Sequence, residues 1–275
     1  MPEQARRASE RVGGVGGAKP PDNIKLQRVE QPDIPQVRVP AWLAALQVFV
    51  ISGIPTQIVV AAILMLGLRL DPFGPDGMMT SMSLEFIATL MLVDTALVAI
   101  LIRVFLEVSG EDSRAVFIGR RKVFGEILRG LAFVPVVFAG VTGIILFLRA
   151  VAPWLHTVKE SPILQFMQTP FEAAIFLVVV VLGGGVKEEL QRGFVLHRFR
   201  QSLGGVRLGL TLFSALFGIL HFDQGWDVAV ALALLGLFWG VAFVQRRSVV
   251  LSMTNHATFN AIQVGQVMLA RHLGL

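Results

Sequence analysis

Long apolar stretches, separated by short polar segments, dominate the sequence from residue 43 onward. A helix that crosses a lipid bilayer needs about 20 mostly apolar residues. The chain is 54% hydrophobic and only 16% charged, whereas a soluble domain carries roughly 25% charged residues. Backbone that spans a bilayer must satisfy its own hydrogen bonds, as helices or as a closed barrel. Apolar stretches of this length predict the first, an all-α, polytopic transmembrane helical bundle.

The apolar stretches predict seven membrane spans, with an eighth, re-entrant or broken segment as an open alternative. The candidate spans are 43–68, 84–106, 130–151, 171–187, 208–222, 228–244 and 249–270. Lysine and arginine gather at 107–129 and 188–207, while the loops at 69–83 and 152–170 hold one basic residue each. Because cytoplasmic loops carry the excess of these residues, we expect an integral protein of the cell (inner) membrane with its N-terminus in the cytoplasm.

Composition divides the chain into three regions. Residues 1–40 are rich in proline, glycine and charge and predict a disordered basic N-terminal tail rather than a signal peptide. Residues 41–160 hold the N-terminal transmembrane helices, and 161–275 hold the region that carries chemistry. The net charge of +5 fits loops that face anionic membrane lipid. With no basic-aromatic module in the sequence, a nucleic-acid partner is not expected.

Three polar motifs lie in the apolar C-terminal region: Lys187-Glu-Glu-Leu-Gln-Arg192, Phe217-Gly-Ile-Leu-His221 and His256-Ala-Thr-Phe-Asn260. Charged and polar residues are rare in membrane helices and usually mark a functional site there. Taken singly, each motif also fits a packing or solvated role. Taken together, one carboxylate and two imidazoles could bind zinc with an open position or activate water directly as a glutamate–histidine pair.

Competing hydrolase signatures are missing from the sequence, including His-Glu-x-x-His and Gly-x-Ser-x-Gly. The three motifs, in this order, resemble those of the CAAX-protease and bacteriocin-processing (CPBP) family of intramembrane endopeptidases, which includes the type II CAAX prenyl endopeptidases. The family motifs are Glu-Glu-x-x-x-Arg, Phe-x-x-x-His and His-x-x-x-Asn, and the resemblance covers about 160–272.

The resemblance implies a CAAX-type intramembrane metalloendopeptidase that acts on a peptide or membrane-protein substrate. Prenylated CAAX proteins, bacteriocin-related peptides and the regulation of membrane proteins remain open as substrate classes. The residues expected to act in catalysis are Glu188, Glu189, Arg192, His221, His256 and Asn260. Zinc would be bound by Glu188, His221 and His256, and a metal-free mechanism stays open.

The first motif departs from the family pattern, because Arg192 stands four residues after Glu188 instead of five. Aligned on the glutamate pair, Glu188 is the base, with Glu189 as the alternative. Aligned on the arginine, the first glutamate has become Lys187, which favours a non-catalytic scaffold or an immunity-type protein that keeps the fold. An ion-coupled transporter is a third reading, and the sequence gives it no inverted repeat.

Glu188 and His221 can share a site only if they lie at the same depth in the membrane. If the fourth span ends at 187, Glu188 lies at the cytoplasmic end, about 20 Å from His221 at 1.5 Å per residue. The two meet only if the fourth helix starts later, a helix breaks, or 186–202 lies in a cavity. Three glycines at 183–185 are expected to break or loosen the span. Asp94 is expected to form a buried polar pair with Arg103, or Arg103 to snorkel to the interface.

Overall fold

The computed structural model describes residues 39–73 and 82–274, and its regular elements in these ranges are helices. One isolated bridge, between Phe73 and Met82, is the only strand-like pairing there. The described residues form one compact unit. The all-α prediction is thus confirmed, and the predicted tail lies almost entirely outside the described residues.

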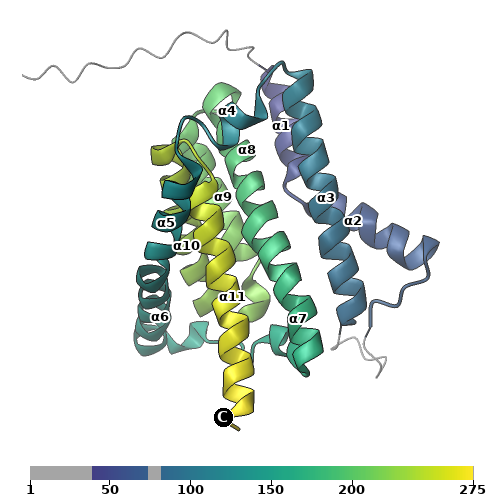
Figure 1. Ribbon diagram of the computed structural model, residues 1–275, viewed down its shortest axis with the longest axis vertical. Helices are drawn as coiled ribbons and strands as arrows, with labels where there is room; N and C mark the ends of the chain where they lie inside the picture. Colours follow the sequence, from purple (N-terminus) through teal and green to yellow (C-terminus); the bar gives the residue numbers. More distant parts are fainter. Residues whose placement is uncertain (1–38, 74–81, 275) are drawn as a thin grey trace, which may run out of the picture. The chain divides into compact units, whose positions relative to one another are not determined.

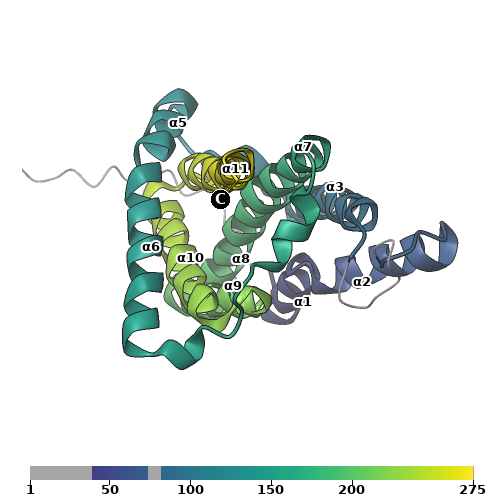
Figure 2. The ribbon, with the colours of Figure 1, turned by 90° about the horizontal axis from the view of Figure 1, so that it is seen from below.

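The N-terminal part of the bundle runs from α1 to α6 (Figure 1). Its elements are α1 (Ala41–Ile51), α2 (Ile54–Ala62) with the π-helix η1 (Ile63–Gly67), α3 (Leu84–Val108), α4 (Ser113–Phe117), α5 (Val123–Ala132) and α6 (Val134–Val151). The run α2–η1 is bent by 50° from α1. Figures 1 and 2 show α2 leaning away from the other helices.

The C-terminal part carries the three motifs. Its elements are the 3₁₀ helices η2 (Pro153–Leu155) and η3 (Pro162–Met167), α7 (Pro170–Val179), η4 (Val180–Lys187), α8 (Glu188–Ser202), α9 (Val206–Ile219), η5 (Phe222–Gln224), α10 (Trp226–Arg246) and α11 (Val250–His272).

Four helical segments within the described residues are long and apolar enough to cross a membrane. They are Leu84–Val108, Val123–Val151, Pro170–Ser202 and Trp226–Arg246, and the bent pair that begins at Ala41 would make a fifth. Helix α9, with 14 residues, is apolar but short. An integral membrane protein follows from these segments, while seven or eight spans remain a prediction.

The predicted span 171–187 is too short, because the helical segment that begins at Pro170 continues to Ser202 and has 33 residues. We call this segment, α7–η4–α8, the fourth helix. It begins at a capping box in which Thr169 and Glu172 exchange hydrogen bonds, a motif that satisfies the first free backbone N–H groups. The three glycines were expected to break or loosen the span, and the structure shows the second outcome. The chain widens there into a π-turn, η4, and then continues as α8.

The three glycines also bring the helices close together. A Cβ atom on Gly185 would lie 2.5 Å from the Ala257 Cβ on α11, and one on Gly183 would lie 3.0 Å from the Met91 side chain on α3. Figures 1 and 2 show the fourth helix between α3 and α11. Close backbone approach of this kind is the use of small residues in membrane helix packing.

The hairpin of α8 and α9 sets the depth of Glu188 and His221 in the bundle. Helices α8 and α9 form a hairpin whose turn holds Gly204 and Gly205 at φ values of 83° and 94°, where glycine carries no steric cost. Counted at 1.5 Å per residue, Glu188 lies about 20 Å from this turn along α8, and His221 lies about as far along α9. Glu188 and His221 therefore lie at one level because α8 begins deep in the bundle.

Candidate functional site

The two adjacent glutamates of the first motif face different surroundings. The Glu188 side chain is 22% exposed, whereas that of Glu189 is 1% exposed. Neighbouring residues on a helix point about 100° apart, so each carboxylate has its own partners. Glu188 is the accessible carboxylate of the pair.

His256, on α11, lies against both glutamates. Its Nδ1 atom is 3.1 Å from Glu189 Oε1, and its Nε2 atom is 3.8 Å from Glu188 Oε2. A carboxylate can only accept a hydrogen bond, so Nδ1 carries the proton and donates to Glu189. Trp239 stacks on the imidazole with ring centroids 3.8 Å apart and an interplanar angle of 19°. The ring is thereby fixed with Nε2 toward Glu188.

His221 follows α9 and is held by its own motif. Its Nδ1 atom donates to the Phe217 carbonyl oxygen at 2.6 Å, which leaves Nε2 as the acceptor of a neutral ring. Phe217 lies between the two imidazoles, with ring centroids 4.8 Å from His221 and 6.1 Å from His256.

Arg192 lies below the glutamates and is almost fully buried, at 1% exposure. Its guanidinium forms an ion pair with Glu189. The guanidinium carbon lies 5.0 Å from the Phe217 ring centroid and 5.4 Å from that of Trp239. A planar cation between aromatic faces is stabilised by the rings as well as by the carboxylate.

Asn260 lies one helical turn after His256 and beside the π-turn. Its Nδ2 atom donates to the Val180 carbonyl oxygen at 3.1 Å. A Cβ atom at Gly184 would lie 2.5 Å from Asn260 Nδ2 and 3.9 Å from His256 Nε2. Glycine at 184 therefore keeps room beside the asparagine amide and the imidazole.

The predicted zinc ligands have the donor chemistry that zinc needs. An oxygen fixes Nδ1 of each imidazole and frees Nε2, as in histidines that bind metal. Among residues 39–73 and 82–274, no three histidine, aspartate or glutamate side chains form a ready-made metal-binding group. Zinc binding by Glu188, His221 and His256 therefore stays a prediction.

Lys187, the residue that disturbs the motif, points away from this site. Its Nζ atom lies 2.8 Å from Asp94 Oδ2 on α3, and the two side chains are 3% and 0% exposed. Gln57 on α2 donates a longer hydrogen bond, of 3.4 Å, to the same oxygen. The predicted pair of Asp94 with Arg103 is wrong, because Arg103 binds Glu107. A lysine stem from the fourth helix reaches Asp94 where the two helices pack closely.

Two residues that support the site carry no motif signal. Trp239 donates from Nε1 to Asn255 Oδ1 at 2.8 Å, and Asn255 donates from Nδ2 to the Gly130 carbonyl oxygen at 2.9 Å. This chain of bonds ties the ring under His256 to α10, α11 and α5. Asn255 stands next to His256 in the sequence, which is a weak signal, but nothing in the sequence around Trp239 marks it.

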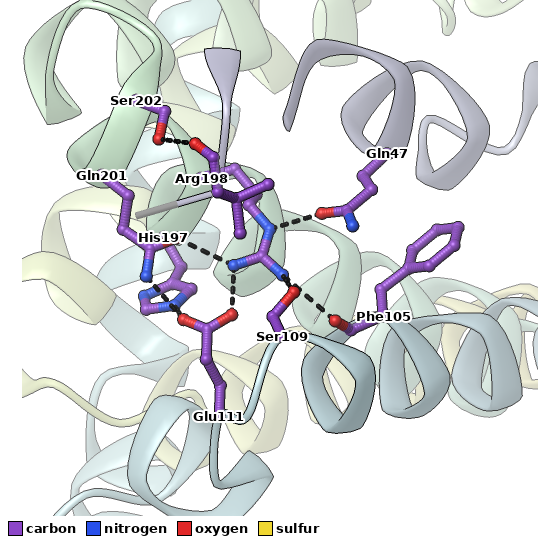
Figure 3. Close-up of polar contacts among 9 residues, drawn as sticks. Gln47, Phe105, Ser109, Glu111, His197, Arg198, Gln201 and Ser202 are labelled. Carbon is purple, nitrogen blue, oxygen red and sulfur yellow. Dashed lines mark hydrogen bonds and ion pairs between the residues drawn. The ribbon is translucent and has the colours of Figure 1, made fainter. Parts of the chain in front are cut away.

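A second polar cluster lies at the turn after α3, away from the catalytic candidates (Figure 3). Arg198, which is fully buried, binds Glu111 and Gln47, and His197 lies 2.5 Å from Glu111. Burial alone would raise the pKa of Glu111, but hydrogen bonds from His197 and Arg198 outweigh it and lower this pKa to about 2. The cluster fastens α1 and the α3–α4 turn to α8.

Near His221, a buried carboxylate anchors the opposite end of the bundle. Asp227, at the start of α10, binds Arg149 of α6 at 2.8 Å and His156 at 3.1 Å. The Trp226 backbone N–H adds a bond to Thr157 Oγ1. The segment after α6 is thus fastened to the turn that carries His221.

Comparison with known proteins follows this geometry. Residues 170–262 match the family model "Type II CAAX prenyl endopeptidase Rce1-like". The resemblance to the CAAX-protease family is confirmed. The matched segment contains all three motifs and begins at the first residue of α7. The match supports a CAAX-protease-like intramembrane peptidase at family level. No curated protein and no solved structure matched the chain.

Proposed function

We propose that the chain is an intramembrane endopeptidase that hydrolyses a peptide bond with water activated by Glu188 and His221. One observation carries the proposal. The accessible carboxylate of Glu188 lies 3.8 Å from His256 Nε2, and the Phe217 ring contacts the imidazoles of both His256 and His221. General bases of this kind need to reach a water molecule directly.

The proposed hydrolysis has two steps. A water molecule donates hydrogen bonds to Glu188 and to His221 Nε2, loses one proton to Glu188 and attacks the carbonyl carbon of the scissile bond. Glu188 then passes this proton to the nitrogen of the leaving amine as the carbon–nitrogen bond breaks. A new carboxyl group and a new amine result, and the enzyme returns to its starting state.

Asn260 and His256 are the proposed partners of the oxyanion that forms in the first step. Asn260 Nδ2 uses one hydrogen for Val180 and has a second to donate. His256, when protonated, donates from Nε2, and its bond to Glu189 steadies the positive ring. Donors fixed in place before the reaction stabilise developing negative charge at little reorganisation cost.

Glu189 and Arg192 have a positioning role in this proposal. Both are buried, and they form an ion pair with each other. Glu189 holds His256 through Nδ1, and Arg192 holds Glu189. Under this assignment, Glu189 is the alternative base only if the experiment below contradicts the role of Glu188.

Zinc remains a proposal that a direct measurement tests. If bound, it would polarise the attacked carbonyl and acidify water, held by Glu188, His221 and His256. Metal analysis of the purified chain, together with activity after chelation, tests the requirement. Activity that persists in metal-free protein supports the direct mechanism, and loss that only zinc restores supports the metalloendopeptidase.

A non-catalytic scaffold is the second candidate, favoured by Lys187 at the first position of the family motif. The buried pair of Lys187 with Asp94 shows that this lysine has a structural partner outside the site. Under either function, we propose seven or eight spans, a cytoplasmic N-terminus and the cell (inner) membrane. Membrane-protein or peptide substrates would enter from the bilayer or its surface.

The test uses detergent-purified chain and three peptide probes: a farnesylated CAAX peptide, its unprenylated counterpart and an unrelated transmembrane peptide. Mass spectrometry of the products reports the cleaved bond. We expect cleavage of one probe by the wild type and none by Glu188→Gln or His221→Ala at unchanged thermal stability. Cleavage by both variants at the wild-type rate would contradict the proposed mechanism. If the wild type cleaves none of the probes, the result would favour the non-catalytic scaffold.

A further inference from the structure

Four exposed cations gather where two turns meet at one end of the bundle. Arg120, Arg121 and Lys122 precede α5, and Arg247 lies between α10 and α11. We call these four residues the cationic patch. None of them belongs to the proposed hydrolytic site.

Backbone contacts hold the two turns together. The Val249 N–H donates to the Phe117 carbonyl oxygen at 2.8 Å, and Arg121 Nε donates to the Arg246 carbonyl oxygen at 3.3 Å. A Cβ atom at Gly119 would lie 2.5 Å from the Arg247 carbonyl oxygen. The cationic patch is thus a fixed part of the fold.

Two carboxylates on neighbouring elements already have cationic partners outside the patch. Glu111 binds Arg198 and His197 (Figure 3). Glu126 is 1% exposed and binds Arg246 at 2.5 Å and Arg129 at 3.1 Å. Both carboxylates are therefore committed to other cations.

The four cations of the patch lie on two turns that are in direct contact. Like charges held this close repel each other, and one added anion would relieve several of these unfavourable interactions at once.

The position of the patch identifies the kind of anion. Lys122 is followed directly by Val123 and Phe124, which are 43% and 71% exposed at the start of the candidate span Val123–Val151. Apolar side chains exposed on a membrane span face the acyl chains of lipid. Cations one residue beyond them lie at the level of the lipid headgroups.

We propose that the cationic patch binds the phosphate of anionic membrane lipids. Basic residues near a membrane surface contribute additively to the attraction of anionic lipid. We expect about 5-fold weaker binding for each patch residue that is neutralised. The inference does not depend on the peptidase activity.

The test uses delipidated, full-length protein in uncharged detergent, titrated with phosphatidylglycerol, phosphatidylcholine or inorganic phosphate, with native mass spectrometry as the readout. We expect phosphatidylglycerol to bind, phosphatidylcholine to bind weakly, and inorganic phosphate not to displace the lipid. Equal binding of the two lipids would overturn the proposal. So would displacement by inorganic phosphate at equal concentration, which would indicate a site for free anions.

Variants assign the binding to the patch. The combined change Arg120→Gln, Arg121→Gln, Lys122→Gln and Arg247→Asn should abolish the preference for phosphatidylglycerol. Asparagine is chosen at 247 because this residue has φ 55°, which asparagine tolerates. If the combined variant does not fold, Arg120→Gln alone still tests the inference. Its control is Lys159→Gln, an exposed lysine beyond the opposite end of α6, which should leave binding unchanged. Unchanged binding in Arg120→Gln and in the combined variant would contradict the assignment.

Discussion

The buried pair of Lys187 and Asp94 makes a quantitative prediction about stability. The Nζ and Oδ2 atoms are 2.8 Å apart, and the side chains are 3% and 0% exposed. Removing one partner of such a pair leaves an uncompensated buried charge and typically costs about 3–5 kcal/mol, whereas apolar replacement of both is often neutral or stabilising. Lys187→Met and Asp94→Leu should each lower the free energy of unfolding by that amount. The double variant should lie within about 1 kcal/mol of the wild type.

The assay is equilibrium unfolding of purified protein in mixed micelles with increasing SDS, analysed as a double-mutant cycle. The pair of Arg103 with Glu107 is a matched control, because it lies on α3 as well but its side chains are 75% and 56% exposed. Loss of an exposed pair should cost less than about 0.5 kcal/mol. Single variants at Lys187 and Asp94 that cost no more than Arg103→Gln would refute the reasoning, as would a double variant whose cost equals the sum of the singles.

Three further predictions concern other parts of the structure. Gly184→Ala should push the Asn260 amide off the Val180 carbonyl oxygen, since the new Cβ would lie 2.5 Å from Nδ2. We expect kcat for cleavage to fall about 100-fold with little change in melting temperature. An unchanged kcat would argue against a role of Asn260 in stabilising the oxyanion. Asn255→Ala should leave Trp239 Nε1 and the Gly130 carbonyl oxygen without partners and lower the free energy of unfolding by about 2–4 kcal/mol, with a loss under about 0.5 kcal/mol as the opposing result. The pKa of Glu111 falls from 4.5 to about 2 on folding, so ionised Glu111 contributes its full share to folding stability above pH 4.5 and loses it as the pH falls toward 2. The melting temperature of the wild type should therefore fall over this range, and that of Glu111→Gln should fall less. Parallel curves for the two proteins would count against a stabilising role of the Glu111 cluster.

Apolar patterning was enough to predict an all-helical membrane bundle, and motif order was enough to predict the resemblance to the family. The end of the fourth helix was beyond such reasoning. Lys187, Glu189 and Arg192 look like the start of a solvated segment, and they are buried only because distant residues bind them. The partner of Lys187 is Asp94, 93 positions earlier, and that of Glu189 is His256, 67 positions later. Single-sequence periodicity carries no information about contacts at such separation.

In the candidate site, too, local contacts could be predicted from the sequence and contacts between distant residues could not. Pairs one helical turn apart, such as His256 with Asn260, follow from helix geometry. The stacking of Trp239 on His256 depends on how α10 and α11 pack, and a tryptophan within an apolar span is unremarkable in sequence. The different surroundings of Glu188 and Glu189 follow from the 100° step between neighbouring helical residues, but the partners of each carboxylate depend on how the helices pack.

The most direct test of the account compares kcat for Glu188→Gln and Glu189→Gln on the probe that the wild type cleaves, with melting temperatures measured alongside. Glutamine keeps the shape of each side chain and removes its basicity. We expect Glu188→Gln to lose about 1,000-fold in kcat at an unchanged melting temperature. We expect Glu189→Gln to lower the melting temperature, because Arg192 loses its buried partner. Near wild-type turnover in Glu188→Gln would contradict the assignment of the base, whatever the behaviour of Glu189→Gln.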